Sequence, residues 1–158
     1  MKSSHKGIYM TPLKALRLEV NALIHATEDA KKVQRAIKEL LPPHLREVPT
    51  LKEKDLEGYY GNPITLINFT LEKSEWATAT LENIIHRFSD PTMRSLASNL
   101  NQYLDNKGNL FLRLDKQAAF SGKLRLRQDD AIRIKIKLNR GNSDYTQFKE
   151  DIKGILVP

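Results

Sequence analysis

The amino-acid sequence predicts an α+β fold, a single domain in which a mostly antiparallel, curved sheet has helices packed on one face. Several segments alternate apolar and polar residues with the period of two that is typical of half-buried strands. The expected helices and strands follow one another in mixed groups, whereas a parallel sheet would require strict alternation. The chain of 158 residues, 40% of them hydrophobic, is long enough for one core. We expect a domain over residues 14–158 after a flexible tail, residues 1–13, in which either Met1 or Met10 is the natural start.

The first element is expected to be a strand, and a helix should follow it. Residues 15–26 alternate in character, and Thr27 after them is typical of a helix N-cap. The helix should continue to about Leu41, where two prolines end it. The apolar face of the strand is expected to consist of Leu16, Leu18, Val20, Ala22 and Ile24.

The middle of the chain predicts two extended segments followed by two helices. Residues 51–59 alternate weakly, and residues 64–71 are rich in β-forming side chains. Ser74 is typical of a helix N-cap, and Asp90 before a proline marks a second helix start. We therefore expect two helices within residues 74–104.

The C-terminal part predicts three further strands and a last helix. Residues 110–114, 123–127 and 132–138 all alternate, and the short link between the last two predicts that they pair as a hairpin. Residues 115–122 are expected to form one helical turn that a glycine with positive φ ends. Residues 145–156 have the apolar spacing of a short helix.

One stretch of the chain, residues 110–140, holds most of the excess positive charge. It contains nine Lys or Arg and three acidic residues, whereas the rest of the chain has 17 basic and 16 acidic residues. Charge concentrated in one segment creates a local field, and a polyanion is its complementary partner.

The two faces of these expected strands differ in chemistry. Cations that meet across a hairpin repel each other by some tenths of a kcal/mol per pair, which favours a phosphate-binding role for their face. Basic strand faces also occur simply because they keep a sheet soluble. The expected surface consists of Phe111, Arg113, Lys123, Arg125, Arg127, Arg133, Lys135 and Lys137. The core-facing residues are Leu110, Leu112, Leu114, Leu124, Leu126, Ile132, Ile134, Ile136 and Leu138.

Two other segments are candidates for RNA contacts. Lys116 and Gln117 open the expected helical turn and can meet a phosphate, or the turn is purely structural with Asp115 as its cap. Tyr59 and Tyr60 can stack on unpaired bases, or they cover a sheet edge. Because aromatic side chains are few, the sequence favours recognition of RNA backbone or shape over base reading.

One cluster, of His25, Glu28 and Asp29, has the residue types of a metal or catalytic site. Adjacent acids point to different sides of a helix, and acids in a first turn already stabilise the helix dipole. We therefore expect a structural role, with no metal, no cofactor and no catalytic residues. The absence of cysteine excludes a thiol nucleophile and cysteine-ligated zinc, and no nucleotide-binding or Ser/His/Asp motif is found.

Three segments taken together resemble one known family. They are IHATED at residues 24–29, GYYGNPI at 58–64, and LRLDKQAAF at 112–120, with Gly-Lys-Leu at 122–124. Over about residues 14–157 the chain resembles an archaeal family of small RNA-binding domains described as predicted exosome subunits. That family has a fold similar to the ribosomal protein that binds five-S ribosomal RNA. The resemblance implies a curved sheet against helices, an RNA-associated role and no known catalytic residues.

The sequence thus predicts a non-catalytic, cytoplasmic RNA-binding protein whose basic strand face contacts the phosphates of structured RNA, such as ribosomal or precursor RNA. RNA-processing proteins are expected as further partners. No apolar run reaches the length of a membrane span. The alternatives are an adaptor that docks on an acidic partner in an RNA-processing complex, and a metal-dependent phosphoesterase around His25. The sequence makes no prediction about the oligomeric state.

Overall fold

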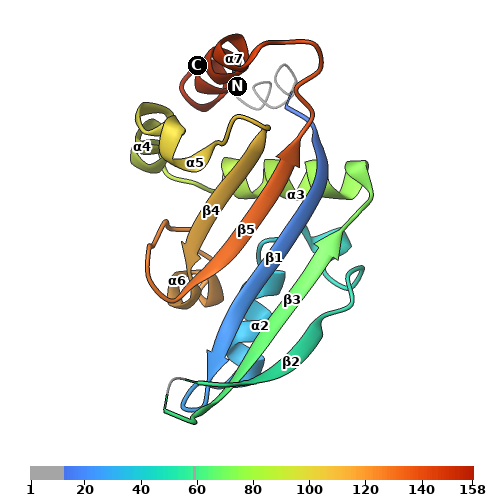
Figure 1. Cartoon of the computed structure of the whole chain (residues 1–158), viewed down its shortest axis with the longest axis vertical. Coiled ribbons are helices and arrows are strands. Elements are labelled where there is room, and N and C mark those ends of the chain that lie inside the picture. The colour runs from blue at the N-terminus through green and yellow to red at the C-terminus, as the bar shows by residue number, and fades with distance from the viewer. Residues whose placement is uncertain (1–12, 59) are drawn as a thin grey trace.

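A five-stranded antiparallel sheet, in the order β2-β3-β1-β5-β4, dominates the computed structural model, which describes residues 13–58 and 60–158 (Figure 1). The predicted α+β class, with a curved sheet and helices packed on one face, is confirmed. The strands are β1 (Ala15–His25), β2 (Lys52–Glu57), β3 (Pro63–Leu71), β4 (Asn109–Asp115) and β5 (Ala131–Leu138). The helices are α2 (Ala30–Lys38), α3 (Ser74–His86), α4 (Asp90–Ser98), α5 (Leu100–Tyr103), α6 (Lys116–Phe120) and α7 (Tyr145–Leu156), with a short 3-10 helix, η1 (Pro43–Leu45).

The core lies between one face of the sheet and the helices α2 and α3. In the middle of the sheet, Val20 of β1 pairs with Phe69 of β3 and with Ile134 of β5, and all three side chains are buried. Alternation then turns every second residue of these strands to the other side. This other side, which we call the open face, points away from α2 and α3 (Figure 1).

β1 departs from the predicted alternation near its first residue. The pairing with β5 shifts between Ala15 and Arg17, and Leu16, which was expected in the core, is 41% exposed. Helix α3 holds this irregular end, because the Ser74 hydroxyl donates to the Ala15 carbonyl at 2.7 Å. The prediction that Ser74 caps α3 is therefore wrong, since Lys73 occupies the N-cap position.

Helix α2 is shorter than the sequence predicted. Asp29 is its N-cap, and the carboxylate accepts a first-turn backbone N–H at 3.0 Å, so the assignment of Thr27 as the cap is wrong. The helix ends at Lys38, before Leu41, although Leu41 is fully buried as expected. The residues between β1 and α2 therefore form a turn that precedes the helix. Glu28 lies in this turn, and its side chain is available for contacts outside the helix.

The helical segment after residue 88 is divided into α4 and α5, which meet at Asn99. Ser89 caps α4 through its hydroxyl, which accepts a backbone N–H at 3.3 Å, whereas Asp90 was the predicted cap. Helix α7 confirms the prediction for residues 145–156, and its apolar stripe enters the core through Phe148 and Ile152.

The C-terminal strands differ most from the prediction. β4 pairs directly with β5, and residues 123–127 form no strand. This segment instead lies along the outer edge of β4, joined to it by one bridge between Leu114 and Leu126. Because β1 and β4 already occupy both edges of β5, the predicted hairpin between residues 123–127 and 132–138 cannot form, and that prediction is wrong.

β2 forms the opposite edge of the sheet, and all six of its residues are exposed. Its pairing with β3 places Lys52 and Lys54 on the open face and Glu53, Asp55 and Glu57 on the other side. A hydrogen bond of 2.8 Å from α2 to the Glu53 carboxylate is consistent with this orientation. The charges of β2 are therefore sorted by sign between the two sides of the sheet.

Residues 1–12 of the expected tail and Tyr59 lie outside the described residues. Leu13, which the prediction also placed in the tail, is instead buried in the core. Within the two described ranges, no helix has the length and apolar character that crossing a membrane requires.

Candidate nucleic-acid interface

Four cations from β4 and β5 share the open face and form a continuous surface, which we call the basic sheet face. They are Arg113, Arg133, Lys135 and Lys137, all exposed. Arg113 lies directly opposite Arg133, and Phe111 lies opposite Lys135. The structure thus brings these four predicted site residues together, as the alternation of the two strands required.

The register continues the basic sheet face across the rest of the sheet. Arg133 pairs with Asn21 of β1, Asn21 with Asn68 of β3, and Asn68 with Lys52 of β2. A single row of two arginines, two asparagines and a lysine therefore crosses all five strands. Asn21, Asn68 and Lys52 were not predicted as site residues, because strand order cannot be read from alternation alone.

Most of this charge is not neutralised within the protein. Arg133 Nε donates to Asn21 Oδ1 at 2.9 Å, and the Lys135 ammonium lies 6.0 Å from the centroid of the Phe111 ring, so both meet neutral partners. Glu19 of β1 is the acidic neighbour of Lys135, but it already pairs with Arg17 at 3.4 Å. The basic sheet face therefore keeps a net positive field.

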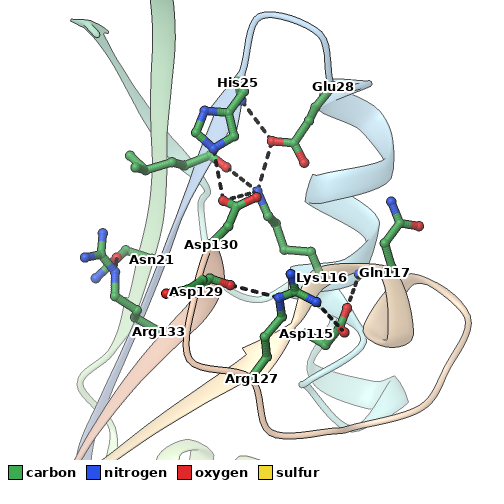
Figure 2. Close-up of polar contacts among 11 residues, drawn as sticks. Asn21, His25, Glu28, Asp115, Lys116, Gln117, Arg127, Asp129, Asp130 and Arg133 are labelled. Carbon is green, nitrogen blue, oxygen red and sulfur yellow. Dashed lines mark hydrogen bonds and ion pairs between the residues drawn. The ribbon is translucent and has the colours of Figure 1, made fainter. Parts of the chain in front are cut away.

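The other three predicted cations belong to the loop of residues 121–130, beside β4. Arg127 Nε donates to the Asp129 carbonyl at 3.0 Å, and its guanidinium lies 3.6 Å from the Asp115 carboxylate (Figure 2). Within the described part of the chain, the side chains of Lys123 and Arg125 have no hydrogen-bond or ion-pair partner. All three are exposed and extend the positive surface beyond the edge strand.

Lys116 has a different environment from the one the sequence suggested. Its side chain is buried, with the whole residue only 7% exposed. The ammonium lies 2.9 Å from the Leu23 carbonyl, from Glu28 Oε1 and from Asp130 Oδ1 (Figure 2). Three oxygen partners satisfy its three donors, so the Lys116 ammonium has no donor left for a phosphate.

The candidate metal cluster is assembled differently from the prediction. His25 and Glu28 do meet, but the third member is Asp130, whose carboxylate lies 3.0 Å from His25 Nε2, while Asp29 only caps α2. The Lys116 ammonium occupies the space between the two carboxylates, and a metal ion would have to displace this cation. Burial raises the pKa of Asp130, but hydrogen bonds from Lys116 and His25 outweigh it, so the pKa lies below its usual value.

The two remaining candidates for RNA contacts, Tyr60 and Gln117, lie outside the basic sheet face. Tyr60 lies in the turn between β2 and β3 and is 87% exposed, far more than a residue that covers a sheet edge. Gln117 is exposed at the start of α6, but its backbone N–H already donates to the Asp115 carboxylate at 2.8 Å. The anion site expected at this short helix is thus occupied by the protein's own cap.

Comparison with known proteins identifies relatives of this chain. A family model described as RNA binding matches residues 17–138, about three quarters of the chain. The chain is similar to "RNA-binding protein PAB1135" of Pyrococcus abyssi, with 30% identity over 80% of this chain and 83% of that protein. It is also similar to an uncharacterised protein, MJ0213, of Methanocaldococcus jannaschii, with 36% identity over 73% of this chain and 78% of that one.

A solved structure supports the same relationship. Mth689, a DUF54 protein from Methanothermobacter thermautotrophicus, superposes with a TM-score of 0.72 and 31% identity, over 90% of this chain and 98% of that one. The matched residues of the family model extend from the third residue of β1 to the end of β5, and so include the basic sheet face and all of the other four strands. The chain therefore belongs to this RNA-binding family of archaeal proteins.

Proposed function

We propose that the basic sheet face binds the phosphate backbone of structured RNA and that the protein has no catalytic role. The polar row that crosses all five strands carries this proposal. Arg113 and Arg133 lie directly opposite each other, which destabilises the folded protein by some tenths of a kcal/mol, and an anion over both side chains would relieve this repulsion. The phosphates of RNA are such anions, and they repeat at every nucleotide.

The side chains of this surface favour recognition of the RNA backbone. Contacts from Lys and Arg to phosphates fix a protein on RNA but carry no sequence information. Paired RNA in the A form is recognised largely by its shape and by its backbone. We therefore expect binding to structured RNA of varied sequence, such as ribosomal or precursor RNA, with Lys123, Arg125 and Arg127 as flanking contacts.

The affinity of the wild-type protein should depend strongly on salt. If about four to six phosphates are neutralised, the logarithm of the affinity falls against the logarithm of salt concentration with a slope of roughly −3 to −5. In the double variant Arg133→Glu with Lys135→Glu, we expect affinity for a paired RNA hairpin to fall at least about tenfold, with a slope shallower by about 2. Fluorescence anisotropy titrations at several salt concentrations measure both quantities.

A matched control separates local charge from total charge. Lys31 of α2 and Arg94 of α4 are exposed and lie outside the sheet, so Lys31→Glu with Arg94→Glu changes the net charge of the protein by the same amount. We expect the control to lose less than about threefold in affinity, since distant exposed charges are largely screened. Unchanged RNA affinity in the sheet variant, with a folded circular dichroism spectrum, contradicts the proposal.

We further propose that the protein acts in the cytoplasm with RNA-processing proteins, including the exosome that the family resemblance implies. An acidic protein surface is the alternative partner for the same face. Pull-down from cells before and after nuclease treatment distinguishes the two. Partners lost with the RNA fit the proposal, whereas a partner retained without RNA and lost in the sheet variant identifies an adaptor.

A further inference from the structure

A cavity of about 380 Å³ lies at the outer edge of β4, beside the basic sheet face. Helix α5 and the loop of residues 121–130 both lie on this side of β4 (Figure 1). The functional side chains of its lining are Gln102, Tyr103, Phe111, Arg113, Gln128 and Arg133, and apolar residues complete it. Two of the four cations of the basic sheet face therefore also line this cavity.

The wall of the cavity is held in place by the protein itself. Arg113 Nη1 donates to the Gln128 carbonyl at 3.2 Å. The backbone N–H of Arg127 donates to the Arg113 carbonyl at 2.9 Å, and the bridge between Leu114 and Leu126 adds a second attachment. The loop is thus fixed to β4 before any ligand arrives, which limits the ordering cost of binding.

The lining combines three kinds of chemistry that suit a nucleotide. Phe111 is 42% exposed, so its ring can stack on a base. The amides of Gln102 and Gln128 offer both donors and acceptors, as the edge of a base does. The cavity has two arginines and no acidic residue in its lining, which favours an anionic ligand.

We propose that this cavity receives one unpaired nucleotide of the RNA that the basic sheet face holds. A base inside a duplex is stacked and paired, so only a bulged or looped nucleotide can enter. The volume is in the range of small-ligand sites. The inference rests on the proposed function, and it adds selection of RNA by the position of an unpaired nucleotide.

The test uses the full chain and two synthetic RNA hairpins, one with a single bulged nucleotide in its stem and one with that nucleotide deleted. A fluorescent adenine analogue serves as the bulged base. We expect the wild-type protein to bind the bulged hairpin at least about fivefold more tightly than the paired hairpin, because one stacked base contributes that much or more. Binding should also change the fluorescence of the analogue.

Variants at Phe111 connect the preference to the cavity. Phe111→Ala should remove the preference, so that its affinities for the bulged and the paired hairpin become equal. Phe111→Trp should keep the preference, because the stacking surface remains. Phe111→Leu keeps the apolar volume without the ring and gives the same test if the alanine variant does not fold. The matched control is Leu56→Ala, a residue 38% exposed on the open face of β2.

Each outcome either supports or overturns the inference. Equal wild-type affinity for the two hairpins, or a preference that persists in Phe111→Ala or Phe111→Leu, overturns it and leaves the proposed function intact. A preference lost equally in the Leu56→Ala control also overturns it, because the effect is then not specific to the cavity. Wild-type protein that binds neither hairpin overturns both this inference and the proposed function.

Discussion

Lys116 shows how the role of one residue depends on its environment. In the sequence it is one cation among nine in a basic stretch, next to a residue expected to cap a helical turn. In the structure its ammonium contacts Leu23 and Glu28 at the junction between β1 and α2, and Asp130 in the loop before β5. Alternation predicts side-chain direction only within a strand, and β4 ends at Asp115. The sequence therefore could not predict on which side of the sheet Lys116 lies.

Replacing Lys116 should affect stability and leave RNA binding unchanged. In Lys116→Met, the carboxylates of Glu28 and Asp130 lose their shared cation, and we expect the free energy of unfolding to fall by about 2 to 3 kcal/mol. Affinity for the paired hairpin should stay within about twofold of wild type, because the buried ammonium contacts no phosphate. Urea unfolding and anisotropy titrations measure the two effects.

The matched control is Lys31→Met, because Lys31 is exposed on α2. It should change the free energy of unfolding by less than about 0.5 kcal/mol. A stable Lys116→Met variant that has lost its RNA affinity contradicts the structural role and would restore Lys116 to the interface.

Asp130 should make stability depend on pH in acid. Its pKa lies below the usual value because hydrogen bonds from Lys116 and His25 outweigh the effect of burial. A lowered folded-state pKa stabilises the protein above the unfolded-state pKa of about 3.9, and this contribution is lost as the pH falls through the folded-state value. Asp130→Asn keeps a side chain that tolerates the positive φ of 47° and removes the charge.

We therefore expect wild type to be more stable than Asp130→Asn at neutral pH by no more than about 1 kcal/mol, since Asp130 is well exposed. The difference should decrease below about pH 4. Urea midpoints across the acidic range measure it. Asp129→Asn, at an exposed neighbour, is the control, and a stability difference that does not change with pH would contradict the assignment.

Among the elements, the loop of residues 121–130 shows why the predicted hairpin with residues 132–138 does not form. Its pattern of alternating Lys, Leu and Arg is that of a strand, and Leu124 and Leu126 do pack inward to different degrees. Whether such a segment pairs depends on a free sheet edge, and β5 has none because β1 and β4 flank it. β4 and β5 were predictable because their alternation and burial agree, whereas strand order depends on contacts distant in sequence.

Two glycines allow a test of the backbone conformation at the start of this loop. Gly122, which ends the turn of α6, has a φ of 85°, and Gly154 lies within α7; a Cβ added at either meets no atom within 4 Å. Gly122→Ala should therefore destabilise the protein by about 1 kcal/mol through backbone strain alone. Gly154→Ala should stabilise it by about 0.5 kcal/mol, because alanine favours the helix.

Thermal or urea unfolding of both glycine variants measures the two opposite shifts. The pair is matched in side-chain change and in free space, so only the backbone conformation differs. Equal effects of the two substitutions would mean that the left-handed conformation at Gly122 is not required in the folded protein.

For the whole molecule, the sequence predicted the class of fold and the chemistry of the basic sheet face. It did not predict how far across the sheet the polar surface extends. The mixed order of helices and strands correctly predicted an α+β fold. The alternation within β4 and β5 placed Arg113, Arg133, Lys135 and Lys137 on one face. The contribution of β1, β3 and β2 to that face could not be predicted, because it depends on the strand order. The cavity beside β4 was also not predictable, since α5, β4 and the following loop meet there only in the folded chain.

The charged edge strand β2 has a consequence for the way the molecule meets its ligand. Lys52 and Lys54 lie on one side of the sheet edge, and Glu53, Asp55 and Glu57 lie on the other. A nearby polyanion attracts the side that carries the lysines and repels the side that carries the acidic residues. These two opposite forces rotate the protein. If the basic sheet face binds RNA as proposed, this rotation turns the open face toward the RNA before contact, so more encounters are productive.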